Sequence, residues 1–138
     1  MDKTKQPGIN FDAIILVEEK FWRNHDVPDN PDLLFNVEMN LNIQEESCNT
    51  QLITTLIMKN EEKEVLKLES TFVGLFSINK ENENMDMERY LKNNSPALMF
   101  PYIREHISAI TQKSGVGPVL LPPINILALI NQKNETQD

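Results

Sequence analysis

The segment Phe35–Gln44, FNVEMNLNIQ, alternates apolar and polar residues along its whole length. Successive side chains of a β-strand point to opposite faces of the sheet, so this alternation predicts a strand with one apolar and one polar face. The apolar positions are Phe35, Val37, Met39, Leu41 and Ile43. This is the clearest strand in the chain, and it makes a β-sheet part of the expected fold.

The segment Phe11–Phe21 predicts an earlier strand, because it is rich in β-branched and aromatic residues. A strict two-residue repeat would place one set on one face: Phe11, Ala13, Ile15, Val17 and Phe21. The opposite face would carry Asp12, Ile14, Leu16, Glu18 and Lys20. Because this second face is mixed, the pattern is compatible with a strand that is covered on both sides.

Two more strands are predicted at Asn49–Lys59 and Glu64–Ile78, joined by a hairpin loop at Asn60–Lys63. A polar turn at Glu45–Asn49, which contains Cys48, precedes them. In the last strand one face would carry Leu66, Leu68, Phe72 and Phe76, and the other Val65, Lys67, Glu69, Thr71 and Val73. The short connections imply antiparallel pairing.

A long crossing loop is predicted at Asn24–Leu34, which holds prolines, asparagines and aspartates. After a polar linker at Asn79–Asn84 the apolar period changes to that of a helix. Ser95 and Pro96 suit an N-cap and first turn, and Pro101 predicts a bend or the true start of the helix.

The helix is expected to end near Gly115, and the following GPVLLPP segment is expected to be extended. Pro123 can then open a short last helix, Ile124–Lys133. Strands followed by helices indicate an α+β fold, here a four-stranded antiparallel sheet, a long helix and a short C-terminal helix. Residues 1–138 are expected to form one domain, with flexible tails at 1–8 and 133–138.

Charge and composition exclude several classes of protein. The net charge is −8, whereas nucleic-acid binding needs a basic surface. The single cysteine rules out an internal disulfide and suits a reducing cytoplasm. The sequence shows neither an apolar leader nor a run as long as a transmembrane helix, so we expect a cytoplasmic protein without membrane insertion.

Candidate catalytic and metal-binding groups are few. His25 and His106 are scattered, and Glu105 points away from its neighbour His106 on a helix. Cys48 has no cysteine or histidine at metal-ligand spacing. The glycines do not form a phosphate-binding loop. We therefore expect no catalytic residue, no metal and no cofactor.

The apolar residues are more informative than the polar ones. Phe21 and Trp22 stand where the crossing loop begins, and Leu33, Leu34 and Phe35 where it ends. The last helix is apolar nearly all round, with Ile124, Ile126, Leu127, Leu129 and Ile130. A short helix cannot bury all of its sides in a small domain, so part of this surface implies subunit contact, ligand binding or binding of unfolded chains.

The segment ALMFPYIREHISAITQKSGVGPVLLPPINILALI resembles the signature of the SecB family of protein-export chaperones. The matching positions are Phe100, Pro101, Tyr102, Arg104, Glu105, Gly115, Pro118, Leu121, Pro123, Asn125, Ala128 and Leu129. Gly74, Leu75 and Phe76 resemble the end of the family's fourth strand. The likeness extends over about Ile9 to Gln132.

This resemblance implies a homotetramer, built as a dimer of dimers, with the long helix between dimers and first strands pairing between subunits. It implies oligomer contacts at Phe100, Tyr102, Ile103, His106 and Ile110. It also implies apolar grooves for unfolded polypeptides between the sheet edge, the crossing loop and the last helix, with client-binding residues Phe21, Trp22, Leu33, Leu34, Phe35, Leu121, Ile124, Leu127 and Ile130.

In the family, acidic residues on the outer face of the sheet bind the export ATPase SecA. Glu69 matches one such position and Glu18 approximately matches another. A further acidic position falls near Trp22 and is not matched, and the segment after the last helix is shorter than usual.

Three functions remain open from the sequence. The first is an ATP-independent holdase for unfolded preproteins in Sec-dependent export. The second is a SecB-like chaperone dedicated to one client, such as the antitoxin of a toxin–antitoxin system. The third is a carrier that holds a small apolar ligand in the groove.

Overall fold

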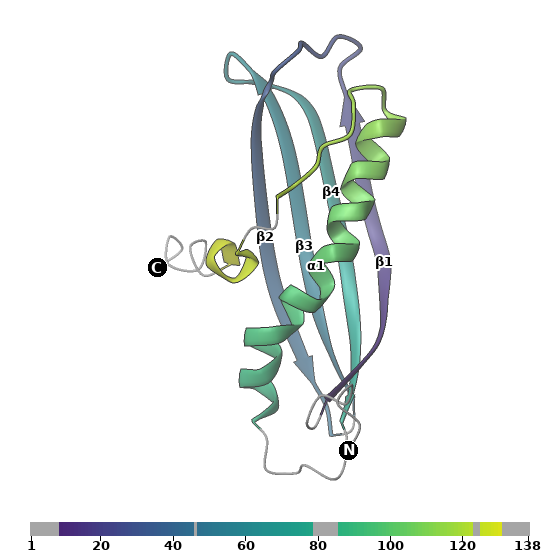
Figure 1. Cartoon of the computed structure of the whole chain (residues 1–138), viewed down its shortest axis with the longest axis vertical. Coiled ribbons are helices and arrows are strands. Elements are labelled where there is room, and N and C mark those ends of the chain that lie inside the picture. The colour runs from purple at the N-terminus through teal and green to yellow at the C-terminus, as the bar shows by residue number, and fades with distance from the viewer. Residues whose placement is uncertain (1–8, 46, 79–85, 123–124, 131–138) are drawn as a thin grey trace.

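The computed structural model describes residues 9–45, 47–78, 86–122 and 125–130. Within these residues the chain forms four strands and one long helix, and residues 126–130 form a short helix (Figure 1). The elements are β1 (Ile9–Arg23), β2 (Asp32–Ile43), β3 (Ser47–Asn60), β4 (Lys63–Ile78) and α1 (Met87–Lys113). The predicted tails at 1–8 and 133–138, and the predicted start of the last helix at Pro123, lie outside the described residues.

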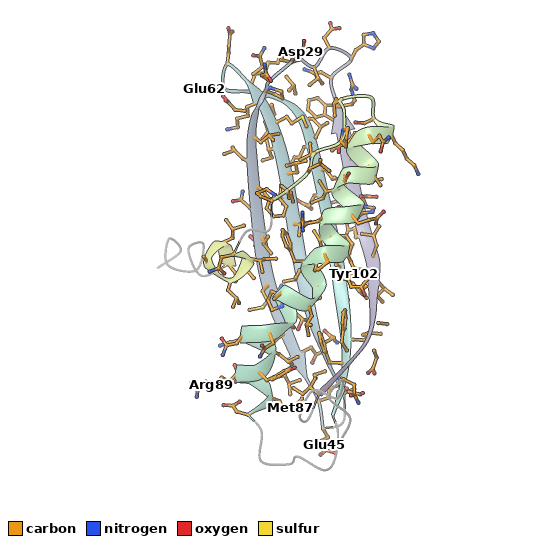
Figure 2. The ribbon with its side chains drawn as sticks, viewed as in Figure 1. Asp29, Glu45, Glu62, Met87, Arg89 and Tyr102 are labelled. Carbon is orange, nitrogen blue, oxygen red and sulfur yellow. The ribbon has the colours of Figure 1, made fainter. Side chains whose placement is uncertain are left out.

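The four strands form one antiparallel sheet in the order β1-β4-β3-β2, as the α+β prediction requires. The crossing loop at residues 24–31 and the β3–β4 hairpin lie at the same end of the sheet, where Figure 2 labels Asp29 and Glu62. Glu45 lies at the other end, between β2 and β3. The loop is shorter than predicted, because Leu33 and Leu34 already pair within β2.

The hairpin between β3 and β4 is closed by Glu61 and Glu62, which have φ angles of 52° and 68°. Positive φ at both central residues is the geometry that matches the right-handed twist of a two-residue hairpin. Two glutamates occupy it here instead of the asparagine and glycine that usually mark such turns. The tight turn fixes the register of β3 on β4 at this end of the sheet.

The strand pairing divides the side chains between two faces. Leu33, Phe35 and Val37 pair with Met58, Leu56 and Thr54, and this alternation continues along β2 to Ile43. The face that α1 packs against is called the covered face, and the opposite one the open face. These registers confirm the predicted faces of β2, and those of β4 from Leu66 onward, whereas Val65, predicted on the opposite face, is buried in the core cluster at a register shift.

The predicted faces of β1 are wrong only in the middle of the strand. Register shifts between Phe11 and Ala13, and between Leu16 and Glu18, interrupt the pairing of β1 with β4. Each shift inserts one extra residue, so the side chains between the two shifts change face, and those after the second shift return to the predicted faces. The covered face of β1 therefore carries Phe11, Ile14, Leu16, Glu19, Phe21 and Arg23, and the open face Ala13, Ile15, Glu18, Lys20 and Trp22.

Helix α1 runs through both prolines, so the prediction that Ser95 caps a new helix is wrong. Asp86 is the N-cap, and its carboxylate accepts a hydrogen bond from the Arg89 amide at 3.2 Å. Pro96 and Pro101 cannot donate to the preceding turn, which removes two hydrogen bonds of the helix and favours bending. Figure 1 shows the helix changing direction in its lower half.

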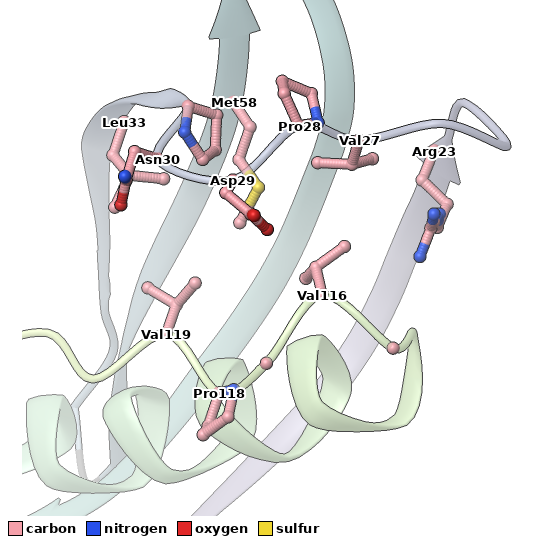
Figure 3. Close-up of a pocket in the computed structure, with 13 residues that line it drawn as sticks. Arg23, Val27, Pro28, Asp29, Asn30, Leu33, Met58, Val116, Pro118 and Val119 are labelled. Atoms are coloured by element: carbon pink, nitrogen blue, oxygen red, sulfur yellow. The ribbon is translucent and has the colours of Figure 1, made fainter.

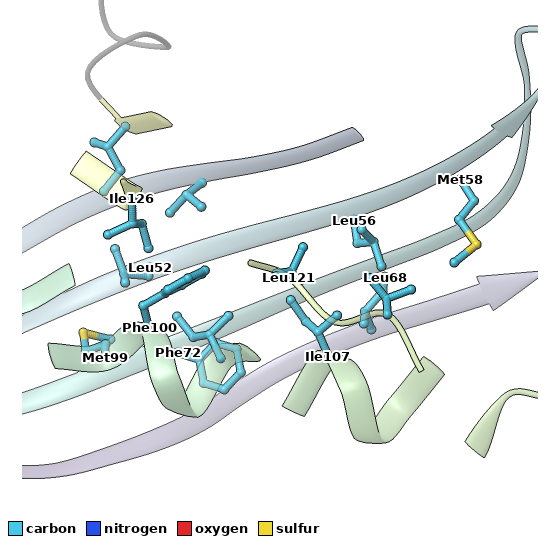
Figure 4. Packing of buried hydrophobic residues seen from close by; sticks show 14 of the residues in the cluster. Leu52, Leu56, Met58, Leu68, Phe72, Met99, Phe100, Ile107, Leu121 and Ile126 are labelled. Atoms are coloured by element: carbon cyan, nitrogen blue, oxygen red, sulfur yellow. The ribbon is translucent and has the colours of Figure 1, made fainter. Parts of the chain in front are cut away.

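The core lies between α1 and the covered face of the sheet (Figure 4). Buried positions of α1 recur at helical spacing and define one face: Leu91, Ser95, Met99, Ile103, Ile107 and Thr111. This face packs against covered-face residues such as Leu52, Leu56, Leu68 and Phe72. Cys48, predicted in a turn, is the second residue of β3 and is buried.

The chain after α1 supplies a second cover for the sheet. Residues 114–122 are neither helical nor strand-like, as predicted for the GPVLLPP segment. Val119 and Leu121 are buried in the core cluster, and so are Ile126 and Ile130 of the short helix. Asn125 starts that helix, because its side-chain oxygen accepts from the Ala128 amide at 3.2 Å.

Gly74 allows the close approach of α1 to β4. A methyl group at this position would lie 2.7 Å from Met99 Sδ and 3.1 Å from the Phe76 ring. Gly74→Ala should therefore lower the free energy of unfolding by about 1–3 kcal/mol, measured by denaturant titration.

The control is Gly74→Ala combined with Met99→Ala, because the second change removes the sulfur that the new methyl group meets. The cost of the pair should be smaller than the sum of the two single costs. Strictly additive costs would show that Gly74 is not needed for this approach.

Candidate functional site

A cleft of about 570 Å³ lies at the crossing-loop end of the molecule (Figure 3). One wall is the crossing loop, with Val27, Pro28 and Pro31, and Leu33 and Met58 of the covered face also line the cleft. The opposite wall is the segment that follows α1, with Val116, Pro118 and Val119. The lining is mixed: valine, proline, leucine and methionine side chains alternate with Arg23, Asp29, Asn30 and backbone polar groups.

The wall that follows α1 depends on its glycines and on a hydrogen bond to the helix. Gly115 and Gly117 have φ angles of 84° and 86°, a conformation that other residues adopt only with strain. They let the chain reverse direction at the end of α1. The Val119 amide then donates to Thr111 Oγ1 at 2.8 Å, which fixes the returning segment to the helix.

Arg23 holds the two walls together. Its guanidinium donates to the carbonyls of Asn24 and His25 in the crossing loop, each at 2.8 Å. It also donates to the Ser114 carbonyl at the end of α1. All three guanidinium nitrogens thus donate to backbone carbonyls of this chain. These hydrogen bonds hold the two walls in place. Asp29 and Asn30 supply the remaining polar side chains of the cleft (Figure 3).

The structure brings only part of the predicted client-binding set to this cleft. Leu33 lines it, and Phe35 lies further along the same face. The ring centroids of Phe35 and Phe100 are 6.5 Å apart. Leu34 and Trp22 lie on the open face, because their pairing partners Ile57 and Lys67 face that way. Phe21 is exposed on the covered face of the edge strand β1.

The C-terminal members of the set are divided as well. Leu121 and Ile130 are buried in the core and are not available to a ligand in this conformation. Leu127 is half-buried on the short helix, and Ile124 lies outside the described residues. The prediction missed the cleft walls at Val27, Pro28, Val116, Pro118 and Val119. The resemblance implies a groove bordered by the crossing loop, but it does not assign these five residues to its walls.

Both predicted SecA-binding residues lie on the open face of adjacent strands. Glu18 pairs in register with Thr71, and Glu69 pairs with Lys20. Glu18 lies 3.7 Å from the Lys20 ammonium, and both side chains are well exposed. Two carboxylates therefore stand near each other on the open face, with one lysine between them.

The predicted oligomer residues of α1 fall on different sides of the helix. Tyr102 is 53% exposed and Ile110 is half-buried. Ile103 has no exposed area and Phe100 is buried, so both belong to the core of the chain itself. They therefore cannot contact another subunit in this conformation. His106 Nε2 lies 2.5 Å from Glu19 Oε1 and ties α1 to β1.

The Glu19–His106 pair has a third member, but it does not form a catalytic triad. Ser70 Oγ donates to the same Glu19 oxygen at 3.2 Å. A nucleophilic serine must donate its hydrogen bond to a histidine nitrogen, and the carboxylate must bind the other nitrogen of that histidine. Here the carboxylate lies between the two other groups, so the histidine cannot take the serine proton.

Neither the cysteine nor a metal site offers chemistry. Burial and, secondly, the charge of Asp12 raise the pKa of the Cys48 thiol, which disfavours the reactive thiolate. Among the described residues, no three histidine, cysteine or carboxylate side chains form a group that could hold a metal ion. Within the same part of the chain, no helix has both the length and the apolar character of a membrane span.

Comparison with known proteins identifies the family. The family model for SecB, described as preprotein translocase subunit SecB, matches residues 18–137. The chain belongs to the SecB family. A SecB-like chaperone of Mycobacterium tuberculosis, solved in complex with a peptide from the HigA1 antitoxin, has the same fold. It superposes with a TM-score of 0.73 at 17% identity, over 83% of this chain and 89% of that one.

Two relatives in the family are named protein-export protein SecB. The one from Methylococcus capsulatus is 36% identical over 102 residues, which cover 70% of this chain and 65% of that protein. The one from Rickettsia rickettsii is 30% identical over 108 residues, which cover 75% and 68%. The SecB match thus spans about two thirds of the length of these relatives.

Proposed function

We propose that this SecB-family protein is a chaperone that holds unfolded or partly folded polypeptides without ATP and without catalysis. The observation that carries the proposal is the cleft between the crossing loop and the segment after α1, where apolar side chains stand beside polar backbone groups that an extended chain can bind. Binding there removes apolar surface of both partners from water, which needs no specific sequence in the client. The name of the two relatives and the family membership agree with this role.

The shape of the cleft suits an extended chain better than a compact ligand. Leu33 and Phe35 are two residues apart on β2 and lie on the same face of the sheet. Together they form an apolar track that leads from the cleft along the strand. β2 is also an edge strand, whose outer backbone groups have no partner strand in the sheet. An extended client can use both the side-chain track and the strand edge. A carrier of a small apolar ligand would need neither.

The proposed assembly is a homotetramer in the cytoplasm. Tyr102 of α1 is exposed, and so are three consecutive apolar residues of the edge strand β1, Ile15, Leu16 and Val17. Exposed apolar surface of this kind on a long edge strand favours contact with other subunits. Four clefts on one particle would add avidity to contacts that are weak one by one.

Delivery of clients to the export ATPase SecA is the finer part of the proposal. Glu18 and Glu69 support it, because both carboxylates are presented on the open face, away from the cleft. A client and an acid-binding partner could then be bound at the same time. A role dedicated to one client is the alternative, and it is favoured by the fold shared with the antitoxin-binding SecB-like chaperone.

Leu33 and Leu34 provide a matched test of the cleft. They are neighbours with similar exposure, 50% and 45%, but they face opposite sides of the sheet. Leu33→Ser should weaken the binding of an unfolded model protein by roughly fivefold, because about 1 kcal/mol of apolar burial is lost per site. Leu34→Ser should weaken the binding clearly less than Leu33→Ser does, because Leu34 lies outside the cleft. Suppression of aggregation and melting temperature should be measured on both variants.

Equal loss of holding activity in the two variants would contradict the cleft as the client site. Loss that follows the melting temperature alone would mean that Leu33 acts only through stability. If the unmodified protein does not suppress aggregation, the holdase proposal fails as a whole.

Tyr102→Asp tests the proposed assembly. A charge placed in an apolar contact should raise the concentration needed for half-assembly by roughly tenfold or more, measured by light scattering. The variant should remain folded, because Tyr102 does not belong to the buried face of α1. Ile103→Asp is the contrasting variant, and it should unfold the chain instead. A monomeric unmodified protein at micromolar concentration would contradict the tetramer.

A further inference from the structure

Trp22 lies on the open face, in another and smaller cleft. None of the residues that line this cleft lines the proposed client cleft. This cleft has a volume of about 260 Å³ and is lined by Lys20, Phe21, Trp22, Lys67 and Glu69. Trp22 is 49% exposed, a large apolar area to leave in water. Because exposed tryptophans often anchor binding partners, this cleft is a candidate interaction site.

The register extends this site into a row across the whole sheet. Trp22 pairs with Lys67, Lys67 with Ile57, and Ile57 with Leu34. All four side chains point to the open face. Strands lie about 4.8 Å apart, so the row is about 14 Å long. An extended peptide of about five residues has that length, at roughly 3.3 Å per residue.

The charges in the row differ from those around it. Lys20 is paired with Glu18 at 3.7 Å and stands opposite Glu69. Lys67, in contrast, forms no ion pair with any residue that the structure describes. An unpaired ammonium thus lies directly beside the exposed indole, with apolar side chains on its other side. A complementary partner would bring one carboxylate and apolar groups around it.

We propose that the row Trp22–Lys67–Ile57–Leu34 binds an extended polypeptide segment that carries an acidic residue beside apolar or aromatic ones. The carboxylate pairs with Lys67, while the apolar side chains pack on Trp22, Ile57 and Leu34. Glu18 and Glu69 stand beside this row on the same face. They, with the net charge of −8, disfavour an extended anionic surface such as a membrane.

The fluorescence of Trp22 tests the proposal directly, because it is the only tryptophan in the chain. The probe is a blocked pentapeptide with phenylalanine and leucine at its ends and glutamate at its second position. Adding it to the full-length protein at low salt should change the indole emission. Peptides with glutamine or lysine in place of the glutamate should bind about threefold more weakly or not at all, as expected for one exposed ion pair.

Lys67→Gln should abolish the preference for glutamate over glutamine. Lys59→Gln is the matched control, because Lys59 lies on β3 opposite Asp32 and outside the row, and it should keep the preference. Both variants should still suppress aggregation of an unfolded protein as well as the parent does. That readout separates this site from the proposed client cleft, on which it does not depend.

The proposal is overturned if the glutamine or lysine peptide binds as tightly as the glutamate peptide. It is also overturned if Lys67→Gln and Lys59→Gln behave alike. A third contradicting result is an emission change caused only by anionic vesicles, or only by raising the protein concentration, since the occupant would then be a membrane or a second copy.

Discussion

One helix has to cover a sheet that is wider and longer than itself, and this mismatch shapes the rest of the molecule. Four strands spaced about 4.8 Å apart make a layer broader than a single helix, which is about 10 Å across. The 27 residues of α1 span about 40 Å, whereas the 16 residues of β4 span about 53 Å. The segment after α1 and the short helix cover part of the remaining apolar face. The uncovered end, between Val116–Val119 and the crossing loop, is the cleft.

The two faces of the sheet offer different chemistry, and the register of the strands decides which residue serves which face. Leu33 and Leu34 are adjacent in sequence but are presented to opposite sides, and Phe21 and Trp22 are divided in the same way. The covered face presents apolar side chains in a cleft. The open face presents Trp22 beside the charged side chains of Lys20, Lys67 and Glu69. In the proposed function, a client held on the covered face would leave the open face accessible to a second partner.

Much of the fold could be predicted from the sequence, because β2 and β4 alternate regularly and α1 has helical spacing. The same rule failed for the middle of β1, where extra residues near Asp12 and Val17 invert the faces of the side chains between them. Local signals also favoured a helix start at Ser95, but Ser95 is instead buried within α1, where its hydroxyl accepts from Thr50 Oγ1 at 2.8 Å. The resemblance implied a groove beside the crossing loop, but the residues of its walls could not be predicted, since Arg23 joins segments that lie far apart in the sequence.

Hydrogen–deuterium exchange with and without a bound unfolded protein tests the proposed client site most directly, because it reports which residues of the chain the unfolded protein contacts. The account predicts slower exchange in residues 24–31 and 114–119, the two walls of the cleft, and along the edge strand β2. The central pairing of β3 with β4 should exchange at the same rate in both states. Unchanged exchange in both walls, while aggregation of the client is suppressed, would contradict the cleft as the client-binding site.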